Sequence, residues 1–281
     1  MKNLIDLHVH SNYSDGTLTP TELVALANKK QLRAFALTDH DTTDGILDAF
    51  QAAKESGTGI EIIPGIELST VYKKKDIHIV GLGININDCY FQDNLKQFQS
   101  ARDVRNYKMI EKLQDKGISI TIESMFEQFG DIVLTRAHFA RYLQDRGYVS
   151  NMHDAFPKYI GDDAPCYVPK ERVTPYQAIQ LIHSSGGKAI LAHPLLYNLS
   201  TEELDILIAS LSKAGLDGLE VYYSQNRYGD EQKMKMIASK YNLKLSGGSD
   251  FHGSNKPNIQ LGTGKGNVNM EYSIWKNLWL S

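Results

Sequence analysis

The chain has 281 residues, 42% of them hydrophobic, and a formal net charge of −3. That length suits one large domain or a domain with an insertion. The small negative charge excludes the strong basic field of a protein that binds long nucleic acids, although a mononucleotide or short oligonucleotide needs only a few local cations. Cys89 and Cys166 form no CxxC pair, so we expect reduced thiols. No signal peptide or run of about 18 apolar residues is recognisable, so we expect a cytoplasmic protein without membrane association.

Short apolar runs alternate with amphipathic stretches over the first 85 residues. The first helix has a clear start, because Thr19 is followed by Pro20 and by Glu22 at the position of a capping box. The expected strands are residues 3–9, 33–37, 60–66 and 77–82, and a second helix is expected over 46–55. This βαβα order predicts parallel strands covered by helices.

The alternation stops between residues 91 and 169. Helical patterns over 94–116 and 136–147 occur there without a convincing strand. Afterwards Thr174 and Ser200 open further capping boxes, a helix is expected over 231–240, and strands are expected over 188–192, 218–221 and 243–247. We therefore predict an α/β barrel made of residues 1–90 and 170–281, with residues 91–169 inserted as a helical cap.

Histidines and carboxylates recur where the predicted strands end. His8 and His10 are two residues apart, so both side chains lie on one face of the first strand. At the other strand ends, on the first loop and within the strand 77–82 stand Asp15, His40, Glu67, His78, His193, Asp250 and His252. Because the carboxyl ends of barrel strands carry the active site, we expect these side chains to meet.

A single histidine at a strand end is more often a structural residue than a metal ligand. The joint pattern is different, since nine ligand-type side chains are expected at one rim. Such a set exceeds the four ligands of one tetrahedral ion. It therefore predicts a cluster of two or three metal ions.

Five ordered motifs, HVHSNYSDG, LTDHDT, PGIELS, AHP and GSDFH, resemble those of the polymerase and histidinol phosphatase (PHP) family. The resemblance implies a distorted (β/α)7 barrel that holds two or three divalent ions. By the family pattern, one ion would be held by His8, His10, Glu67 and Asp250. Glu67 would bridge to a second ion on His78 and His193, and a third ion would take Asp15, His40 and His252.

The resemblance assigns catalysis to the ligands of the first two ions, where a hydroxide bridging the metals would attack phosphorus. The residues concerned are His8, His10, Glu67, His193 and Asp250. Asp15 stands where some relatives have histidine. A carboxylate is the harder ligand, which favours Mn²⁺, with Zn²⁺ or Fe²⁺ as alternatives.

The inserted segment resembles the PHP branch of nucleoside 3′,5′-bisphosphate phosphatases and 5′-3′ exoribonucleases of short RNA. The resemblance lies in TRAHFAR at 135–141, YVP at 167–169 and GGKA at 186–189. It implies that Arg136, His138 and Arg105 bind a substrate phosphate, for which an arginine at a helix start is suited. Arg102, Lys108 and Arg141 are interpreted as surface charges.

Three further features have no assigned role in the motifs. His153 belongs to none of them, and His183 is expected to be a packed or surface residue. Asp39 and Asp41 flank His40, and either could orient its ring or cap the next helix. The glycine-rich stretch 262–266 fits no phosphate-loop spacing and is interpreted as a turn.

The predicted function is hydrolysis of the 3′-phosphate of nucleoside bisphosphates, release of 5′-mononucleotides from short 5′-phosphorylated RNA, or both. One alternative is a phosphatase of the histidinol-phosphate type, which would have no evident use for a second phosphate site. Another is a metal-bearing PHP interaction module without catalysis. The expected partner is the nucleotide or oligoribonucleotide substrate, and the sequence indicates no protein partner.

Overall fold

A computed structural model describes residues 3–169 and 173–280. Seven strands form one sheet in chain order. They are β1 (Ile5–Val9), β2 (Ala34–Leu37), β3 (Glu61–Tyr72), β4 (Lys75–Leu82), β5 (Lys188–Leu191), β6 (Gly218–Tyr223) and β7 (Lys244–Gly248). The sheet curls until its edges meet, since Val9 forms a bridge with Phe251 and the His10 amide donates to the Phe251 carbonyl at 3.0 Å. The predicted seven-stranded α/β barrel is confirmed.

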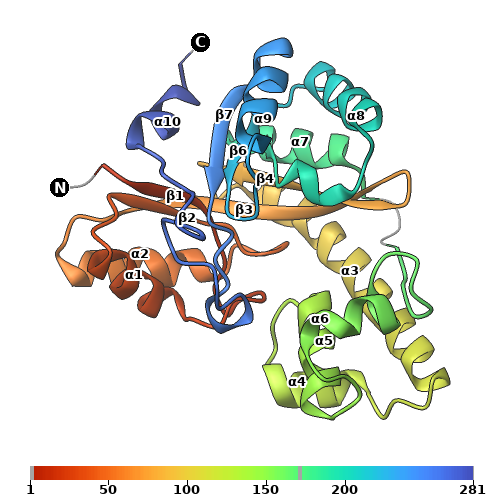
Figure 1. Cartoon of the computed structure of the whole chain (residues 1–281). Helices are drawn as coiled ribbons and strands as arrows, with labels where there is room; N and C mark the ends of the chain where they lie inside the picture. Colours follow the sequence, from red (N-terminus) through yellow and green to blue (C-terminus); the bar gives the residue numbers. More distant parts are fainter. Residues whose placement is uncertain (1–2, 170–172, 281) are drawn as a thin grey trace.

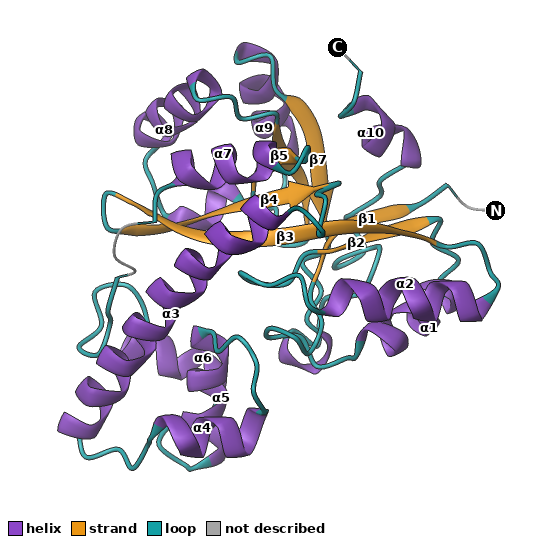
Figure 2. Ribbon diagram, turned by 180° about the vertical axis from the view of Figure 1, so that it is seen from behind, coloured by secondary structure: helices purple, strands orange, loops and turns teal. Residues whose placement is uncertain are grey.

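Helices cover the outside of the barrel (Figures 1 and 2). The pair α1 (Pro20–Lys29) and α2 (Gly45–Ser56) lies on one side, and α7 (Pro175–Ser184), α8 (Thr201–Lys213) and α9 (Asp230–Lys240) lie on the other. The capping boxes predicted at Thr19, Thr174 and Ser200 are all present. A short helix α10 (Tyr272–Asn277) lies near the C-terminus.

One strand runs against the others. The strands β1–β2–β3 and β5–β6–β7 pair in parallel, but β4 is antiparallel to both of its neighbours. The hairpin β3–β4 is closed by Lys73 and Lys74, whose φ angles of 47° and 68° suit a two-residue turn. Strand β3 therefore continues to Tyr72, six residues beyond the end expected from its apolar run.

Residues 83–169 contain helices and loops but no strand. The helices are α3 (Cys89–Asp115), α4 (Ile122–Phe129), α5 (Arg136–Asp145), α6 (Met152–Ala155) and the π-helical turn η1 (Phe156–Ile160). The first half of α3 packs on the barrel through Phe91, Leu95 and Phe98. Its second half contributes Met109 and Leu113 to a separate apolar core shared with α4, α5 and α6. The 27-residue helix α3 thus joins two cores (Figure 2).

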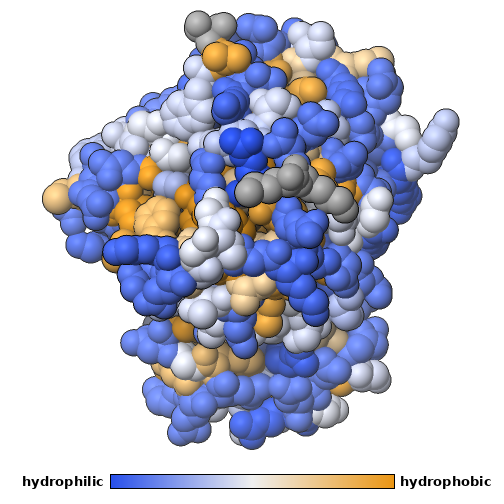
Figure 3. All heavy atoms as spheres, turned by 90° about the vertical axis from the view of Figure 1, so that its left-hand side faces the viewer, coloured by the Kyte–Doolittle hydropathy of each residue, from blue (hydrophilic) through white to orange (hydrophobic). Residues whose placement is uncertain are grey.

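The outer surface is mostly hydrophilic. On the face that carries the N-terminus, apolar residues form only smaller areas among polar ones (Figure 3). Within the described ranges, no helix is both long enough and apolar enough to cross a bilayer.

Candidate metal centre

The nine predicted ligands meet at the carboxyl ends of the barrel strands. Glu67 lies at the centre, although it comes from the middle of the long strand β3. Its Oε2 is 3.3 Å from His8 Nε2, 3.2 Å from His10 Nε2 and 3.1 Å from His40 Nδ1. Its Oε1 is 2.8 Å from His78 Nδ1 and 2.9 Å from His193 Nε2. One carboxylate therefore has five imidazoles around it.

Asp15 organises the adjoining part of the cluster. Its Oδ1 is 3.2 Å from His252 Nε2 and 3.7 Å from His10 Nδ1, and its Oδ2 is 3.7 Å from His40 Nε2. Asp250 Oδ1 closes the other side, 3.5 Å from His10 Nε2. Three groups have ligand atoms within 4.8 Å of one another: His10–Asp15–His40–His252, His8–His10–Glu67 and His40–Glu67–His78.

These groups overlap the ligand sets expected from the sequence without matching them in every member. The first adds His10 to the expected third set, and the last contains His40 where the expected second set has His193. Since His10, His40 and Glu67 each belong to two groups, the geometry suits neighbouring ions with shared ligands better than isolated ones.

Several buried ligand atoms have no protein partner. Among the described residues, five buried side-chain atoms accept and donate no hydrogen bond: His8 Nε2, His10 Nε2, Asp15 Oδ1, His40 Nδ1 and His193 Nδ1. A buried polar atom without a partner costs about 1–3 kcal/mol, and here all five belong to predicted ligands. The donor set of imidazoles and carboxylates therefore fits divalent metal ions.

The charge states of Glu67, His10 and His40 also suit metal binding. Burial would raise the pKa of Glu67, but His40, His78 and His8 hold it well below its usual range. Burial lowers the pKa of His10 to about 4, with a further contribution from His252, and burial holds the pKa of His40 well below its usual range. Ionised carboxylates and neutral imidazoles are the forms that bind metals. At His8, in contrast, burial would lower the pKa, but Glu67 and Glu220 hold it well above its usual range.

Two of the ligands have unusual backbone conformations. His193 has a φ of 26° and Asp250 a φ of 55°, although neither is glycine. Such conformations cost of order 1–3 kcal/mol and persist where the surrounding structure imposes them. Here they turn the chain directly after β5 and β7, so that both side chains join the cluster.

A second layer of residues, which the motifs did not reveal, orients the ligands. Glu220 on β6 accepts a hydrogen bond from the His193 amide at 2.5 Å and lies 3.0 Å from His8 Nδ1. Tyr223 and Lys256 both donate to Asp250 Oδ2, at 2.8 and 2.6 Å. The sequence signal for Glu220 was a lone carboxylate in an apolar strand, the same signal that identified His78.

The cluster lies in a cavity of about 500 Å³ that three arginines also line. Arg136 Nη2 is 2.8 Å from Asp76 Oδ2, and its Nη1 is 3.2 Å from Asp162 Oδ1. Burial opposes the charge of Arg136, but Asp76 and Asp162 raise its pKa above the usual value. Arg136 therefore lines the cavity with its guanidinium already paired with two carboxylates.

Arg105 is in a different situation. It is only 4% exposed, and its one hydrogen-bond partner within the described residues is the neighbouring Asn106, whose Oδ1 accepts from Nε at 2.9 Å. Burial, together with Arg102 and Arg136, lowers the pKa of Arg105 to about 9. A buried cation without a carboxylate partner is costly unless an anion completes it.

The surface position expected for Arg102 was wrong. Its side chain is 4% exposed, and its Nη2 lies 2.6 Å from Asp41 Oδ2 and 2.6 Å from Ser69 Oγ. Asp41 therefore holds α3 against the barrel. Asp39 accepts from Ser11 and Ser14, at 2.6 and 2.5 Å from their hydroxyls, and so orders the first loop.

His138 occupies a different place from the one expected of a phosphate ligand. It does not line the metal cavity but an adjacent hollow. Its Nδ1 accepts from the Thr135 amide at 2.9 Å, which completes a capping box at the start of α5, while the Ser14 carbonyl accepts from the ring. Thr135 in turn donates to Asp15 Oδ2 at 2.9 Å. His138 thus positions Thr135 and, through it, a predicted metal ligand.

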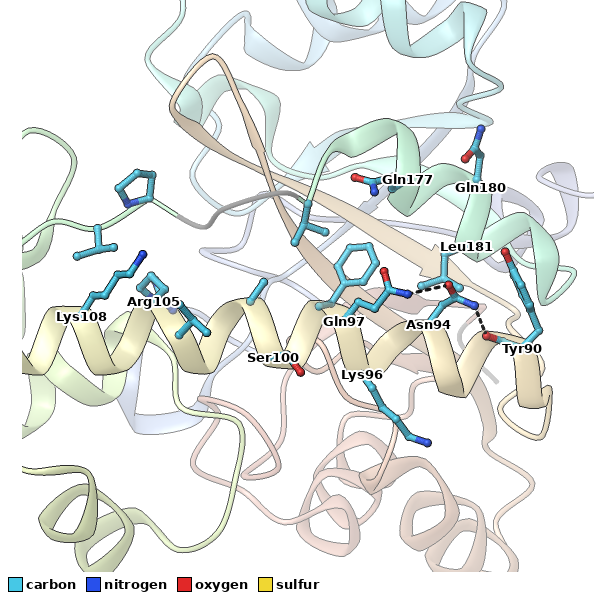
Figure 4. A pocket seen from close by; sticks show the side chains of 16 residues that line it. Tyr90, Asn94, Lys96, Gln97, Ser100, Arg105, Lys108, Gln177, Gln180 and Leu181 are labelled. Atoms are coloured by element: carbon cyan, nitrogen blue, oxygen red, sulfur yellow. Dashed lines mark hydrogen bonds between the residues drawn. The ribbon is translucent and has the colours of Figure 1, made fainter.

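The remaining residues discussed in the sequence analysis lie in different environments. His183 is a surface residue whose Nε2 lies 2.7 Å from Asp217 Oδ2. Arg141 is partly buried and donates to Asn255 Oδ1 at 2.7 Å. His153, which no motif contains, lines the metal cavity. A larger hollow of about 770 Å³ follows α3 and α7, with Lys108 on its wall (Figure 4), but none of the nine ligands lines it.

Comparison with known proteins agrees with this geometry. The model of the PHP domain matches residues 6–255. The chain belongs to the PHP family. It is 39% identical to the 5′-3′ exoribonuclease Rnm of Escherichia coli over 92% of this chain and 88% of that protein. It is 34% identical to the 3′,5′-nucleoside bisphosphate phosphatase of Chromobacterium violaceum over 98% and 96% of the two chains.

A solved structure is similar over the same extent. The proposed metal-dependent phosphoesterase of Bifidobacterium adolescentis superposes with a TM-score of 0.84 at 30% identity, covering 98% of this chain and 94% of that one. The family, the cluster and these relatives together identify the chain as an enzyme, a metal-dependent phosphoesterase of the PHP family.

Proposed function

We propose that the enzyme removes the 3′-phosphate of nucleoside 3′,5′-bisphosphates and releases 5′-mononucleotides from short 5′-phosphorylated RNA. The names of its two relatives support both reactions. The substrates share one feature, a phosphate on each side of a ribose. A site for them needs a place where one phosphate reacts and a second place that holds the other.

The observation that carries the proposal is the buried cation of Arg105 beside the metal cluster. Seven of the nine predicted ligands and this guanidinium line the cavity together, and Arg105 forms no ion pair with a carboxylate among the described residues. A phosphate would supply that partner through charge-assisted, bidentate hydrogen bonds. Arg136 would assist from the start of α5, whereas we assign His138 to positioning.

The reacting phosphate would lie at the cluster. Bound divalent ions would act there as Lewis acids and lower the pKa of a water molecule. The chain holds the ligands ready: Glu220 fixes His8 and the turn at His193, while Tyr223 and Lys256 fix Asp250. We propose His8, His10, Glu67, His193 and Asp250 as the ligands closest to the reaction, with His40, His78, Asp15 and His252 completing two or three ion sites.

We further propose that Mn²⁺ is the working metal rather than Zn²⁺ or Fe²⁺. The three buried carboxylates, Asp15, Glu67 and Asp250, make the cluster harder than an all-histidine site. Elemental analysis of the purified protein, followed by reconstitution of metal-free enzyme with each ion, tests this assignment. Higher activity with Zn²⁺ than with Mn²⁺ would contradict it.

The inserted helices would serve as the substrate-binding cap. Arg105 comes from α3 and Arg136 from α5, both within residues 91–169, whereas the nine ligands come from residues 1–90 and 170–281. Each part therefore contributes one of the two phosphate positions. This division makes substrate preference a property of the insertion.

A substrate panel tests the proposed function. With Mn²⁺ present, we expect adenosine 3′,5′-bisphosphate and a short 5′-phosphorylated RNA to be hydrolysed much faster than histidinol phosphate, which carries one phosphate. A preference for histidinol phosphate would show that the second phosphate site has another role.

A further inference from the structure

Part of the lining of the metal cavity consists of side chains that are neither metal ligands nor cations. Met152, Phe156 and Leu196 line it, with the polar side chains of His153 and Gln225. Leu196 is 43% exposed and lies three residues after the ligand His193, on the short helix η2 (Pro194–Tyr197). A large apolar side chain that is exposed inside a charged cavity suits a ligand with an apolar surface.

The apolar wall (Met152, Phe156 and Leu196) comes from both parts of the protein. Leu196 belongs to the barrel, and Met152 and Phe156 belong to the inserted helices. Met152 and Phe156 are four residues apart, and both also pack against the core of the insertion. That packing holds the two side chains in place, so a flat ligand would meet a preformed surface.

We propose that the apolar wall binds the nucleobase of the substrate, and this proposal rests on the proposed function. In a nucleoside bisphosphate the two phosphates would be taken by the metal cluster and by Arg105. The base is the remaining planar, largely apolar part of the molecule, and the wall is the remaining apolar part of the cavity. The cavity volume of about 500 Å³ falls in the range of roughly 300–1,000 Å³ usual for small-ligand sites.

The chemistry of the wall also predicts its selectivity. Aliphatic, thioether and phenyl groups contact the face of any base, because every base has a π-face. His153 and Gln225, both exposed, can hydrogen-bond at its edge, although the Gln225 amide already donates to the Tyr223 hydroxyl at 3.2 Å. The wall thus selects nucleotides over sugar phosphates without a strong preference among the four bases.

The experiment compares adenosine 3′,5′-bisphosphate with ribose 3,5-bisphosphate, which lacks the base. Burying one large apolar side chain against the base contributes enough binding for us to expect a kcat/KM about 10-fold higher with the nucleotide. Leu196→Ala should remove most of this preference, because it should lower kcat/KM for the nucleotide more than for ribose 3,5-bisphosphate. Leu47→Ala is the matched control, because Leu47 is a 62% exposed leucine on α2, away from the cavity.

A binding measurement separates this proposal from the proposed function. In calorimetric titrations we expect adenosine 5′-phosphate to bind the wild type and Leu47→Ala more tightly than ribose 5-phosphate does, and this difference to be smaller for Leu196→Ala. An equal difference for all three proteins, or equal rates with and without the base, would overturn the nucleobase site. If neither bisphosphate is hydrolysed, the proposed function fails alone, because the titration still tests the wall.

Discussion

Replacing Arg105 with methionine should weaken catalysis and stabilise the substrate-free protein at the same time. Methionine keeps the apolar stem and removes the buried charge. A hydrogen bond to a charged group contributes about 1.5–3 kcal/mol, so kcat/KM for a bisphosphate should fall about 10- to 150-fold. An aryl monophosphate, which does not use the second phosphate position, should be affected less than about threefold.

The stability change follows from the surroundings of the guanidinium. Arg105 is buried beside Arg102 and Arg136, and its pKa is lowered to about 9. At pH 7 to 8 it is therefore a buried cation, whose desolvation costs several kcal/mol. Loss of the hydrogen bond to Asn106 destabilises the variant by about 1 kcal/mol or more, which offsets part of this gain. A net gain of about 1–2 kcal/mol would raise Tm by roughly 2–6 °C.

Thermal melting with and without inorganic phosphate measures both effects. Phosphate should raise the Tm of the wild type clearly and that of Arg105→Met only slightly, because the variant lacks the buried cation. Arg227→Met removes an exposed arginine and should behave like the wild type. The assignment of Arg105 as a buried cation without a carboxylate partner is refuted by either of two results. One is a lower Tm of Arg105→Met than of the wild type without phosphate, and the other is an equal loss of kcat/KM with the bisphosphate and the aryl monophosphate.

Four other changes separate the remaining roles. Glu67→Gln should abolish turnover of every substrate and lower the metal content measured by elemental analysis; full activity would exclude Glu67 as a shared ligand. Arg102→Met should lower the unfolding free energy by about 3–5 kcal/mol in denaturant titrations, because it removes the guanidinium from the buried ion pair with Asp41. His138→Phe should cost about 1–2 kcal/mol through the lost cap and slow bisphosphate and aryl phosphate alike, whereas a selective loss would restore it as a phosphate ligand. Asp217→Asn should destabilise the protein at pH 7, and this effect should shrink as the pH falls below the ordinary aspartate pKa of 3.8. Against the effect of burial, hydrogen bonds from His183 and Ala189 lower the pKa of Asp217 in the fold, so its contribution is present above the unfolded pKa and disappears as pH falls through the folded one.

Local chemistry made much of the fold and the cluster predictable. Strands, capping boxes and the order of the elements depend on residues that are neighbours in the sequence, so the barrel could be predicted from the sequence alone. The ligands were predictable because parallel strands bring their carboxyl ends to one rim, which converts positions in sequence into positions in space. His10, His193 and Asp250, which follow β1, β5 and β7 within two residues, were found in this way.

The features that the sequence did not predict depend on partners that are far away along the chain or on unusual residues in a familiar motif. Arg102 looks like a surface charge in a helical pattern because its partner, Asp41, is 61 residues away. The antiparallel course of β4 depends on a turn at Lys73 and Lys74. Lysine, unlike glycine or asparagine, does not indicate a left-handed backbone conformation in the sequence. His138 was misplaced because histidine replaces the usual glutamate or glutamine at the third position of a capping box.

The helix α3 explains how two phosphate positions can keep a fixed separation although they belong to different parts of the chain. At about 1.5 Å per residue its 27 residues span about 40 Å, with Phe98 in the barrel core and Met109 in the core of the insertion. Arg102 and Arg105 lie between these anchors, one turn apart. Because Asp41 follows the ligand His40 directly, the pair Arg102–Asp41 ties this turn to the metal cluster. Any motion of the insertion that moved Arg105 along the cavity would first have to break this buried ion pair. The distance between the metal cluster and Arg105 is therefore set by the fold rather than by the substrate.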